Sequence, residues 1–237
     1  MGHIKRSMTQ PDNEKPFDVL LFDLGGIFVK LSGAPRMMAL TRETLSIDEL
    51  WTKWLDSPSV KNFESGKSSS KEFAMAMVDE FGLIIDPLQF LEEFAEWSNT
   101  LYPGTRTLLN TLSANYTLAS LSNTNFIHWE YFCEDLKLPD LFHYNFPSHE
   151  TGYIKPDKEA FINVIQTLSC RPERILFIDD IQQNVDSARK TGMAAIRVKG
   201  IDQVATSLHK MGVLNDIRFN PSDPSTTMED LRFYPTR

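Results

Sequence analysis

The first strong hydrophobic signal in the chain is the run from Phe17 to Phe22, which only Asp18 interrupts. A short, nearly continuous apolar run is typical of a strand buried on both faces of a parallel sheet. Asp23 follows this run, and a Gly-Gly pair comes two residues later. Taken alone, Asp23 is explained equally well as a residue that caps a turn. In open α/β sheets, however, ligands bind beyond the carboxyl ends of the strands, so Asp23 also stands where chemistry is expected.

From residue 35 to residue 101 the apolar positions change to helical spacing, and no convincing strand is predicted there. Capping boxes are expected at Ser46/Glu49 and Ser69/Glu72. Ser57 and Asp86 are cap residues before a proline, and Gly66 and Gly82 are glycines that terminate helices. One helical face carries an apolar stripe, which we expect to pack in a bundle core rather than to hold a ligand: Leu91, Phe94, Trp97 and Leu101. The stretch predicts a small all-helical cap at 35–101, inserted after the first strand.

Beyond residue 104 the predicted elements alternate between helix and strand. Helices are expected at 105–113, 127–136, 157–168, 182–191 and 202–211, and strands at 116–121, 144–146, 174–178 and 194–198. This alternation implies a parallel sheet covered by helices on both faces. The predicted fold class is therefore α/β, with a three-layer Rossmann-like core at 17–34 and 102–215, a flexible leader at 1–16 and a tail at 216–237.

Composition narrows the possible partners. The chain has 237 residues, which allows one core domain with a smaller insert, and its net charge is −8. This negative charge argues against binding to nucleic acid or to an anionic membrane. Cys133 and Cys170 are its two cysteines, no apolar run is long enough to span a membrane, and no signal peptide is evident. We expect a cytoplasmic protein, monomeric or homodimeric, in a reducing compartment.

Polar residues gather at the predicted carboxyl edge of the sheet. Besides Asp23, they are Ser122 and Asn123 after one strand, Lys155 before a loop proline, and Asp179 and Asp180 after another strand. Singly, the Ser-Asn pair is more often a helix cap and the lysine a solvated charge. Adjacent aspartates at the edge of a core, however, repel one another and need a cation close by or another cause that keeps them there. Carboxylates suit Mg²⁺, and a hydroxyl, backbone N–H groups and an ammonium suit a phosphate group.

These segments, in this order and spacing, resemble the haloacid dehalogenase superfamily with a helical cap, and most of all its branch that dephosphorylates sugar phosphates. The resemblance covers about residues 17–198 and rests on the motifs Phe-Asp-Leu-Gly-Gly, Leu-Ser-Asn-Thr-Asn and Phe-Ile-Asp-Asp. It implies Mg²⁺-dependent hydrolysis of a small phosphorylated substrate. By the same resemblance, Asp23 is the nucleophile that forms an aspartyl-phosphate, and Ser122, Asn123 and Lys155 bind the phosphoryl group. The implied metal ligands are Asp23, the backbone carbonyl of Gly25, Asp180 and, directly or through water, Asp179.

Gly25 departs from the family pattern, because phosphatases of the family usually carry an acidic general acid–base residue there. General acid–base help is worth roughly 10²–10⁴ in rate, so its loss predicts a preference for good leaving groups such as sugar 1-phosphates, acyl phosphates or aryl phosphates. His128 is one conceivable substitute, although a single histidine near a helix start is more often a cap or surface residue. Two alternatives stay open: a metal-free hydrolase like the 2-haloacid dehalogenases, and a non-catalytic binding or regulatory protein. The paired aspartates count against the first alternative.

Overall fold

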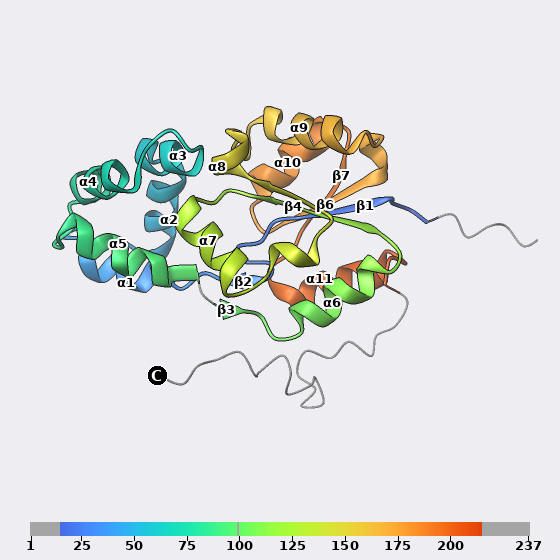
Figure 1. Cartoon of the computed structure of the whole chain (residues 1–237), viewed down its shortest axis with the longest axis horizontal. Coiled ribbons are helices and arrows are strands. Elements are labelled where there is room, and N and C mark those ends of the chain that lie inside the picture. Colours follow the sequence, from blue (N-terminus) through green and yellow to red (C-terminus); the bar gives the residue numbers. More distant parts are fainter. Residues whose placement is uncertain (1–14, 99, 215–237) are drawn as a thin grey trace, which may run out of the picture.

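Five parallel strands form the central sheet, in the order β5-β4-β1-β6-β7 (Figure 1). The computed structural model describes residues 15–98 and 100–214. The strand bounds are β1 Val19–Phe22, β4 Thr117–Ser122, β5 Tyr144–Pro147, β6 Ile175–Asp179 and β7 Ala194–Arg197. Phe22 at the end of β1 is in register with Ser120 on β4 and with Ile178 on β6. The carboxyl ends of the three central strands therefore lie at one edge of the sheet.

The central strand β1 is buried on both faces, as its apolar run predicts. Leu20 and Phe22 face one apolar core, and Val19 and Leu21 face a second core on the other side of the sheet. The first core is covered by α6 Thr105–Ser113, α7 Phe126–Glu134 and α11 Gly200–Lys210, and the second by α9 Lys158–Leu168 and α10 Gln182–Lys190. The predicted three-layer α/β fold is confirmed.

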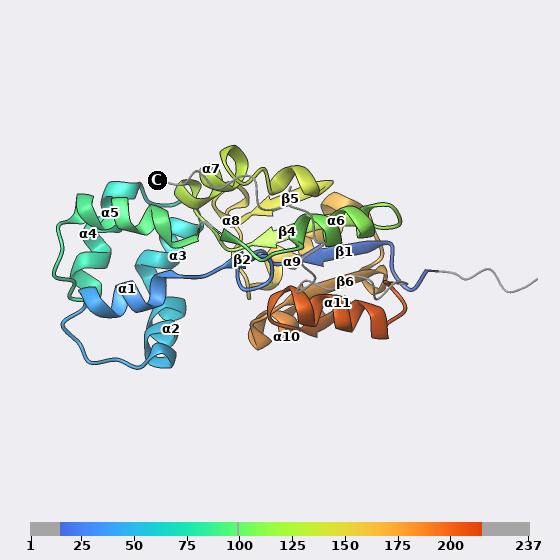
Figure 2. The same cartoon turned by 90° about the horizontal axis from the view of Figure 1, so that it is seen from below.

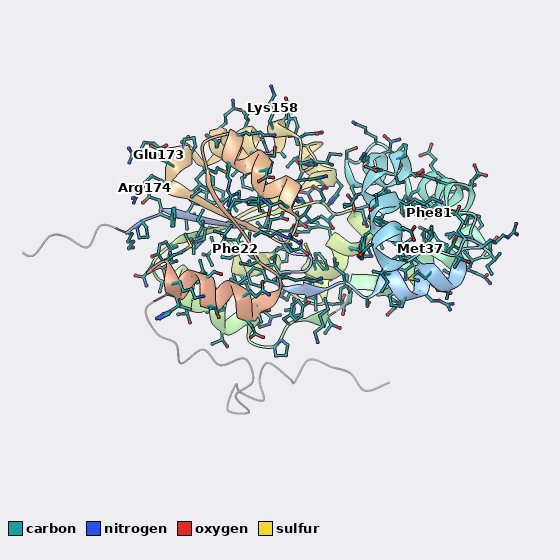
Figure 3. The ribbon with its side chains drawn as sticks, turned by 180° about the vertical axis from the view of Figure 1, so that it is seen from behind. Phe22, Met37, Phe81, Lys158, Glu173 and Arg174 are labelled. Carbon is teal, nitrogen blue, oxygen red and sulfur yellow. The ribbon has the colours of Figure 1, made fainter. Side chains whose placement is uncertain are left out.

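A separate group of helices lies beyond the carboxyl ends of the strands (Figure 2). Its members are α1 Gly33–Leu40, α2 Ile47–Asp56, α3 Pro58–Glu64, α4 Ser70–Glu80 and α5 Pro87–Ala95. The capping boxes at Ser46 and Ser69 are formed, and Ser57 and Asp86 cap α3 and α5. Met37 and Phe81 lie inside this cap, whereas Phe22 lies within the sheet (Figure 3). The cap therefore has an apolar core of its own.

The connection between core and cap differs from the sequence prediction. Two strands, β2 Val29–Lys30 and β3 Thr100–Leu101, pair antiparallel where the chain enters and leaves the cap. The expected stripe is thus cut short, because α5 ends at Ala95 and Leu101 lies on β3. The first cap helix also starts earlier than expected, at Gly33. Two-residue strands are too short to produce a periodic signal, so the sequence could not reveal them.

The remaining elements agree with the predicted order within a few residues. Short helices that the sequence prediction lacks are α8 Ser148–Thr151, η2 Pro139–Leu141 and η3 Pro172–Arg174, whereas η1 Glu96–Ser98 falls within the stretch predicted as helical. Most of the predicted leader and all of the predicted tail lie outside the described residues. Within the described residues, no helix is long and apolar enough to cross a membrane, and both cysteines carry free thiols.

Candidate active site

A cavity of about 720 Å³ opens between the carboxyl edge of the sheet and the cap. Most of the residues singled out from the sequence line it: Asp23, Gly25, Ser122, Asn123, Lys155 and Asp180. Asp179 lies beneath this surface and is fully buried at the end of β6. The fold therefore brings together every predicted site residue, with Asp179 in the supporting layer rather than in the cavity wall.

Lys155 joins two of the strand ends. Its Nζ donates to Oδ1 of Asp23 and to Oδ2 of Asp179, each at 2.8 Å, and all three residues are buried. Burial alone would lower the pKa of the Lys155 ammonium, but the charges of Asp179 and Asp23 outweigh it and raise this pKa. Lys155 is therefore a fixed cation that contacts the proposed nucleophile directly.

The side chain of Asn123 holds the backbone of Lys155. Its Oδ1 accepts from the Lys155 backbone N–H at 2.8 Å, and its Nδ2 donates to the Lys155 carbonyl oxygen at 2.9 Å. Both polar ends of the amide are thus engaged in this pairing. Asn123 fixes the loop that delivers the ammonium to the site.

Asp179 is held as firmly as Lys155. Its Oδ1 accepts from the backbone N–H of Ile181 at 2.7 Å, and Nδ2 of Asn184 contacts both of its carboxylate oxygens, at 3.1 and 3.0 Å. With the bond from Lys155, both oxygens already have partners within the chain. The geometry of Asp179 suits the orientation of Lys155 better than direct contact with a ligand in the cavity.

Asp23, Asp179 and Asp180 form an acidic cluster, in which each residue can offer one carboxylate oxygen within 4.8 Å of the others. Burial raises the pKa of Asp23 to about 7 against the opposing charge of Lys155, and the charges of Asp179 and Asp180 add to that rise. Burial and the charge of Asp179 also raise the pKa of Asp180. Hard carboxylate oxygens with this excess of negative charge fit a divalent cation such as Mg²⁺.

Gly25 does not need to be a glycine on conformational grounds. It is absent from the positive-φ residues of the described chain, and a Cβ built there would lie 3.3 Å from Cδ2 of Leu31. The Leu31 side chain is 46% exposed and can move aside. An acidic side chain at this position is therefore sterically possible, although the chain carries none.

His128 is not available as a substitute proton donor. Its Nε2 donates to the carbonyl oxygen of Phe94 at 2.7 Å, and its Nδ1 accepts from Nδ2 of Asn125 at 3.2 Å. Burial lowers the pKa of the His128 imidazole to about 4, so the ring is neutral at neutral pH. The sequence suggested that His128 is a cap or surface residue, but it is buried and links α7 to the end of α5. The residue that caps α7 is Asn125.

The cap side of the cavity is rich in aromatic residues. Trp51, Trp54, Phe94 and Trp97 line it, and the rings of Trp54 and Phe94 stack with centroids 6.2 Å apart. Phe94 and Trp97 belong to the cap core as predicted, but they also face the cavity. The indole N–H of Trp97 is buried and has no acceptor within the described part of the chain. Sequence periodicity identified the apolar stripe but not its second role. A helical pattern shows which face of a helix is apolar, but not whether part of that face borders a cavity.

A family model described as haloacid dehalogenase-like hydrolase matches residues 17–192. This range includes both the strand-end residues and the cap. The chain belongs to this hydrolase family. The superfamily resemblance seen in the sequence is thereby confirmed.

Two curated relatives and one solved structure illustrate the similarity. Flavin mononucleotide hydrolase 1 of Arabidopsis thaliana is 32% identical over 151 residues, 60% of this chain and 61% of that protein. Drimenol cyclase drtB of Aspergillus calidoustus is 27% identical over 199 residues, 80% of this chain but 35% of that protein. The chain thus spans less than two thirds of the length of either relative. An HAD family enzyme of Bacteroides thetaiotaomicron, solved with magnesium and inorganic phosphate, shares the fold, with a TM-score of 0.62, 24% identity and coverage of 77% of this chain and 94% of that one.

Proposed function

We propose that this hydrolase is a Mg²⁺-dependent phosphatase that acts on a small phosphorylated metabolite through an aspartyl-phosphate on Asp23. The observation that carries the proposal is the acidic cluster with Lys155 at its centre, where Nζ lies 2.8 Å from Asp23. Such a site combines a carboxylate nucleophile, a fixed cation and oxygen ligands for a hard metal. The solved relative with magnesium and inorganic phosphate is consistent with this chemistry.

In this proposal each residue has a defined task. A carboxylate oxygen of Asp23 attacks phosphorus, while the Lys155 ammonium and the Ser122 hydroxyl bind the phosphoryl oxygens. Backbone N–H groups near Asn123 contribute to the same binding, since its side chain is engaged with Lys155. Mg²⁺, held by Asp23, Asp180 and the Gly25 carbonyl, would supply positive charge that offsets the repulsion between an anionic nucleophile and a phosphate dianion.

The two rival functions make different demands on the site. A metal-free hydrolase that attacks a haloacid carbon has no use for a second and third carboxylate beside the nucleophile, so the cluster of Asp23, Asp179 and Asp180 disfavours it. A purely binding protein has no use for a buried lysine held on the nucleophile. Both features favour phosphoryl transfer.

The cavity also bears on the leaving group. A sugar phosphate is the substrate that the sequence motifs suggest, but sugars are held by many hydrogen bonds, and the cap wall is largely aromatic and aliphatic. Trp51, Trp54 and Trp97 line the cavity, and their indole rings suit a flat ring. A phosphate ester of a flat, ring-containing alcohol or phenol is therefore a second substrate class. Flavin mononucleotide, which the name of the Arabidopsis relative gives as its substrate, belongs to this class.

A phosphate-release assay tests the function and the substrate class together. The panel contains a sugar 1-phosphate, a sugar 6-phosphate, flavin mononucleotide and an aryl phosphate, each with Mg²⁺ and with EDTA. We expect turnover that requires Mg²⁺ and that Asp23→Asn abolishes, with inorganic phosphate still binding to the variant. Activity that survives EDTA, or that survives in Asp23→Asn, would refute the proposed chemistry.

A further inference from the structure

A phosphatase built on this site needs a proton donor for the leaving oxygen, and the usual position is glycine. Gly25 has no side chain, and both ring nitrogens of His128 are bonded within the fold. Besides Asp23 and Asp180, three carboxyl groups of the described residues line the cavity: Asp56, Glu64 and Asp157. The donor is best sought among these three.

Glu64 is the last residue of the cap helix α3, and this end of α3 is anchored on the core. The ring of Phe63 meets Phe126 of α7 edge-on, with centroids 5.0 Å apart. Gly66, with φ +71°, lies so close to α8 that a Cβ there would overlap the carbonyl oxygen of His149 and lie 3.3 Å from its carbonyl carbon. These contacts on both sides of Glu64 hold this end of α3 against the core.

The electrostatic surroundings connect Glu64 with the reacting centre. Its side chain is partly buried and faces the cavity, where the charges of Lys155 and Asp23 act on it. Burial raises the pKa of Glu64 to about 7, with Lys155 lowering it and Asp23 raising it. A carboxyl group that holds its proton near neutral pH, and can also release it, is suited to general acid–base catalysis.

Other charged groups face the same space and must be considered with Glu64. From the cap these are Asp56 and Lys61, and from the core Asp23, Lys155, Asp157, Asp180 and Lys199, with neutral His128 beside them. Lys61 Nζ donates to the backbone carbonyl of Asp56 at 3.3 Å, and burial lowers the pKa of His149 on the adjoining helix α8. Besides burial, the charges of Lys155 and Asp23 act on the pKa of Glu64.

We infer that Glu64 is the general acid and base of this enzyme, supplied by the cap in place of the side chain that Gly25 lacks; the inference rests on the proposed phosphatase function. In the first step a carboxylate oxygen of Asp23 bonds to phosphorus, the bond from phosphorus to the leaving oxygen breaks, and Glu64 gives its proton to that oxygen. In the second step the Glu64 carboxylate takes a proton from water as the water oxygen bonds to phosphorus. The Asp23–phosphorus bond breaks, phosphate leaves, and Glu64 is protonated again.

The test compares Glu64→Gln with Asp56→Asn, a matched loss of a cap carboxylate from the same cavity. For Glu64→Gln we expect kcat/KM on a primary-alcohol phosphate to fall about 10²–10⁴-fold, with a much smaller loss on an aryl or acyl phosphate, whose leaving oxygen needs no proton. On the aryl phosphate the aspartyl-phosphate should accumulate and give a burst of phenol release, because its formation needs no proton from Glu64 while the attack of water is slowed. The fall in kcat/KM above about pH 7 should disappear in this variant. Asp56→Asn should behave as the wild type.

Rescue and binding measurements separate catalysis from structure. Gly25→Asp added to Glu64→Gln should restore part of the rate on poor leaving groups, since Leu31 can yield to the new side chain. The inhibition constant of inorganic phosphate and the melting temperature should stay within about twofold and a few degrees of the wild type. An active wild type whose rates on poor leaving groups are unchanged by Glu64→Gln would overturn this inference alone. A wild type without Mg²⁺-dependent phosphatase activity would overturn the proposed function together with it.

Discussion

Gly26 and Asp180 approach so closely that no side chain fits between them. A Cβ built on Gly26 would lie 2.9 Å from Cγ of Asp180 and closer still to its Oδ2. The φ of Gly26 is +69°, and its carbonyl accepts from the N–H of Gly200 at 2.8 Å, which holds the turn in place. Glycine is therefore required here both by the backbone conformation and by the neighbouring carboxylate.

Gly26→Ala tests this relationship against Gly152→Ala as the control. Gly152 has a similar φ, +76°, but a Cβ there meets nothing within 4 Å. Both variants should lose about 1–2 kcal/mol of unfolding free energy from the left-handed backbone. Only Gly26→Ala should also displace Asp180 and weaken Mg²⁺ binding and turnover. Urea unfolding and Mg²⁺ titration of both variants measure the two effects, and equal Mg²⁺ affinities would contradict the expectation.

The two adjacent aspartates should respond differently to the same substitution. Asp180 faces the cavity, whereas Asp179 is buried and bonded to Lys155 and Asn184. Asp180→Asn should weaken Mg²⁺ binding more than Asp179→Asn does. Asp179→Asn should instead lower kcat by about 10–100-fold, as is usual for a partner that orients a functional group.

Asp157→Asn serves as the control for this pair, because Asp157 lines the same cavity outside the acidic cluster. Isothermal titration with Mg²⁺ and steady-state kinetics on all three variants give the comparison. If Asp179→Asn weakens Mg²⁺ binding as strongly as Asp180→Asn, then Asp179 is a metal ligand and not a positioning residue.

Features that depend on local sequence patterns could be predicted from the sequence, whereas features that depend on packing between distant segments could not. The strand that ends at Asp23, the capping boxes and the alternation of helices and strands are local patterns, and the structure has the elements that they predict. The meeting of Asp23 with Ser122 and Asp179 followed from parallel strands ending at one edge. Lys155 lies on the loop between α8 and α9, and its place in the site was expected from the family resemblance. Glu64 and Trp54 carried no such signal, because their place in the cavity depends on how the cap packs against the core. The β2–β3 ribbon was missed because strands of two residues produce no periodic signal.

His128 should make stability depend on pH in the weakly acidic range. The pKa of His128 is about 4 in the folded protein because the ring is buried, against an ordinary value of 6.5. Between these values the unfolded chain binds a proton that the folded protein does not. The unfolding free energy should therefore be unaffected by this residue above about pH 6.5 and fall by about 3 kcal/mol on going down to pH 4.

His128→Gln isolates this contribution, because the amide can still bond to Phe94 and Asn125 without titrating. We expect the variant to be slightly less stable than the wild type at pH 7.5 and more stable than the wild type near pH 4.5, because only the wild type loses this contribution as the pH falls. Urea unfolding of both proteins in EDTA at several pH values gives the difference, in which the contributions of all other groups cancel. Two pH curves that run parallel would contradict the assignment of a neutral, buried imidazole.

The aromatic wall of the cavity should select substrates through Trp97. A substitution at Gly33 tests this role without changing a catalytic group. A Cβ on Gly33 would lie 2.5 Å from Cδ2 of Trp97 and closer to Cε3, so Gly33→Ala must displace the indole. The ring packs edge-on against Phe90 and Phe94, which limits where it can move. Contacts of a flat substrate ring with aromatic side chains are worth about 0.5–1.5 kcal/mol, or about two- to tenfold in kcat/KM.

Gly33→Ala should therefore lower kcat/KM on flavin mononucleotide and aryl phosphates by about that factor. Acetyl phosphate, which has no ring to place against the cap, serves as the control substrate and should be hydrolysed at the wild-type rate. The comparison is made within one variant, so a general loss of stability would affect both substrates alike and would not produce a difference. An equal loss on the ring-containing substrates and on acetyl phosphate would mean that Trp97 supports the cap but does not recognise the substrate. The sugar phosphate predicted from the sequence motifs would then be the favoured substrate.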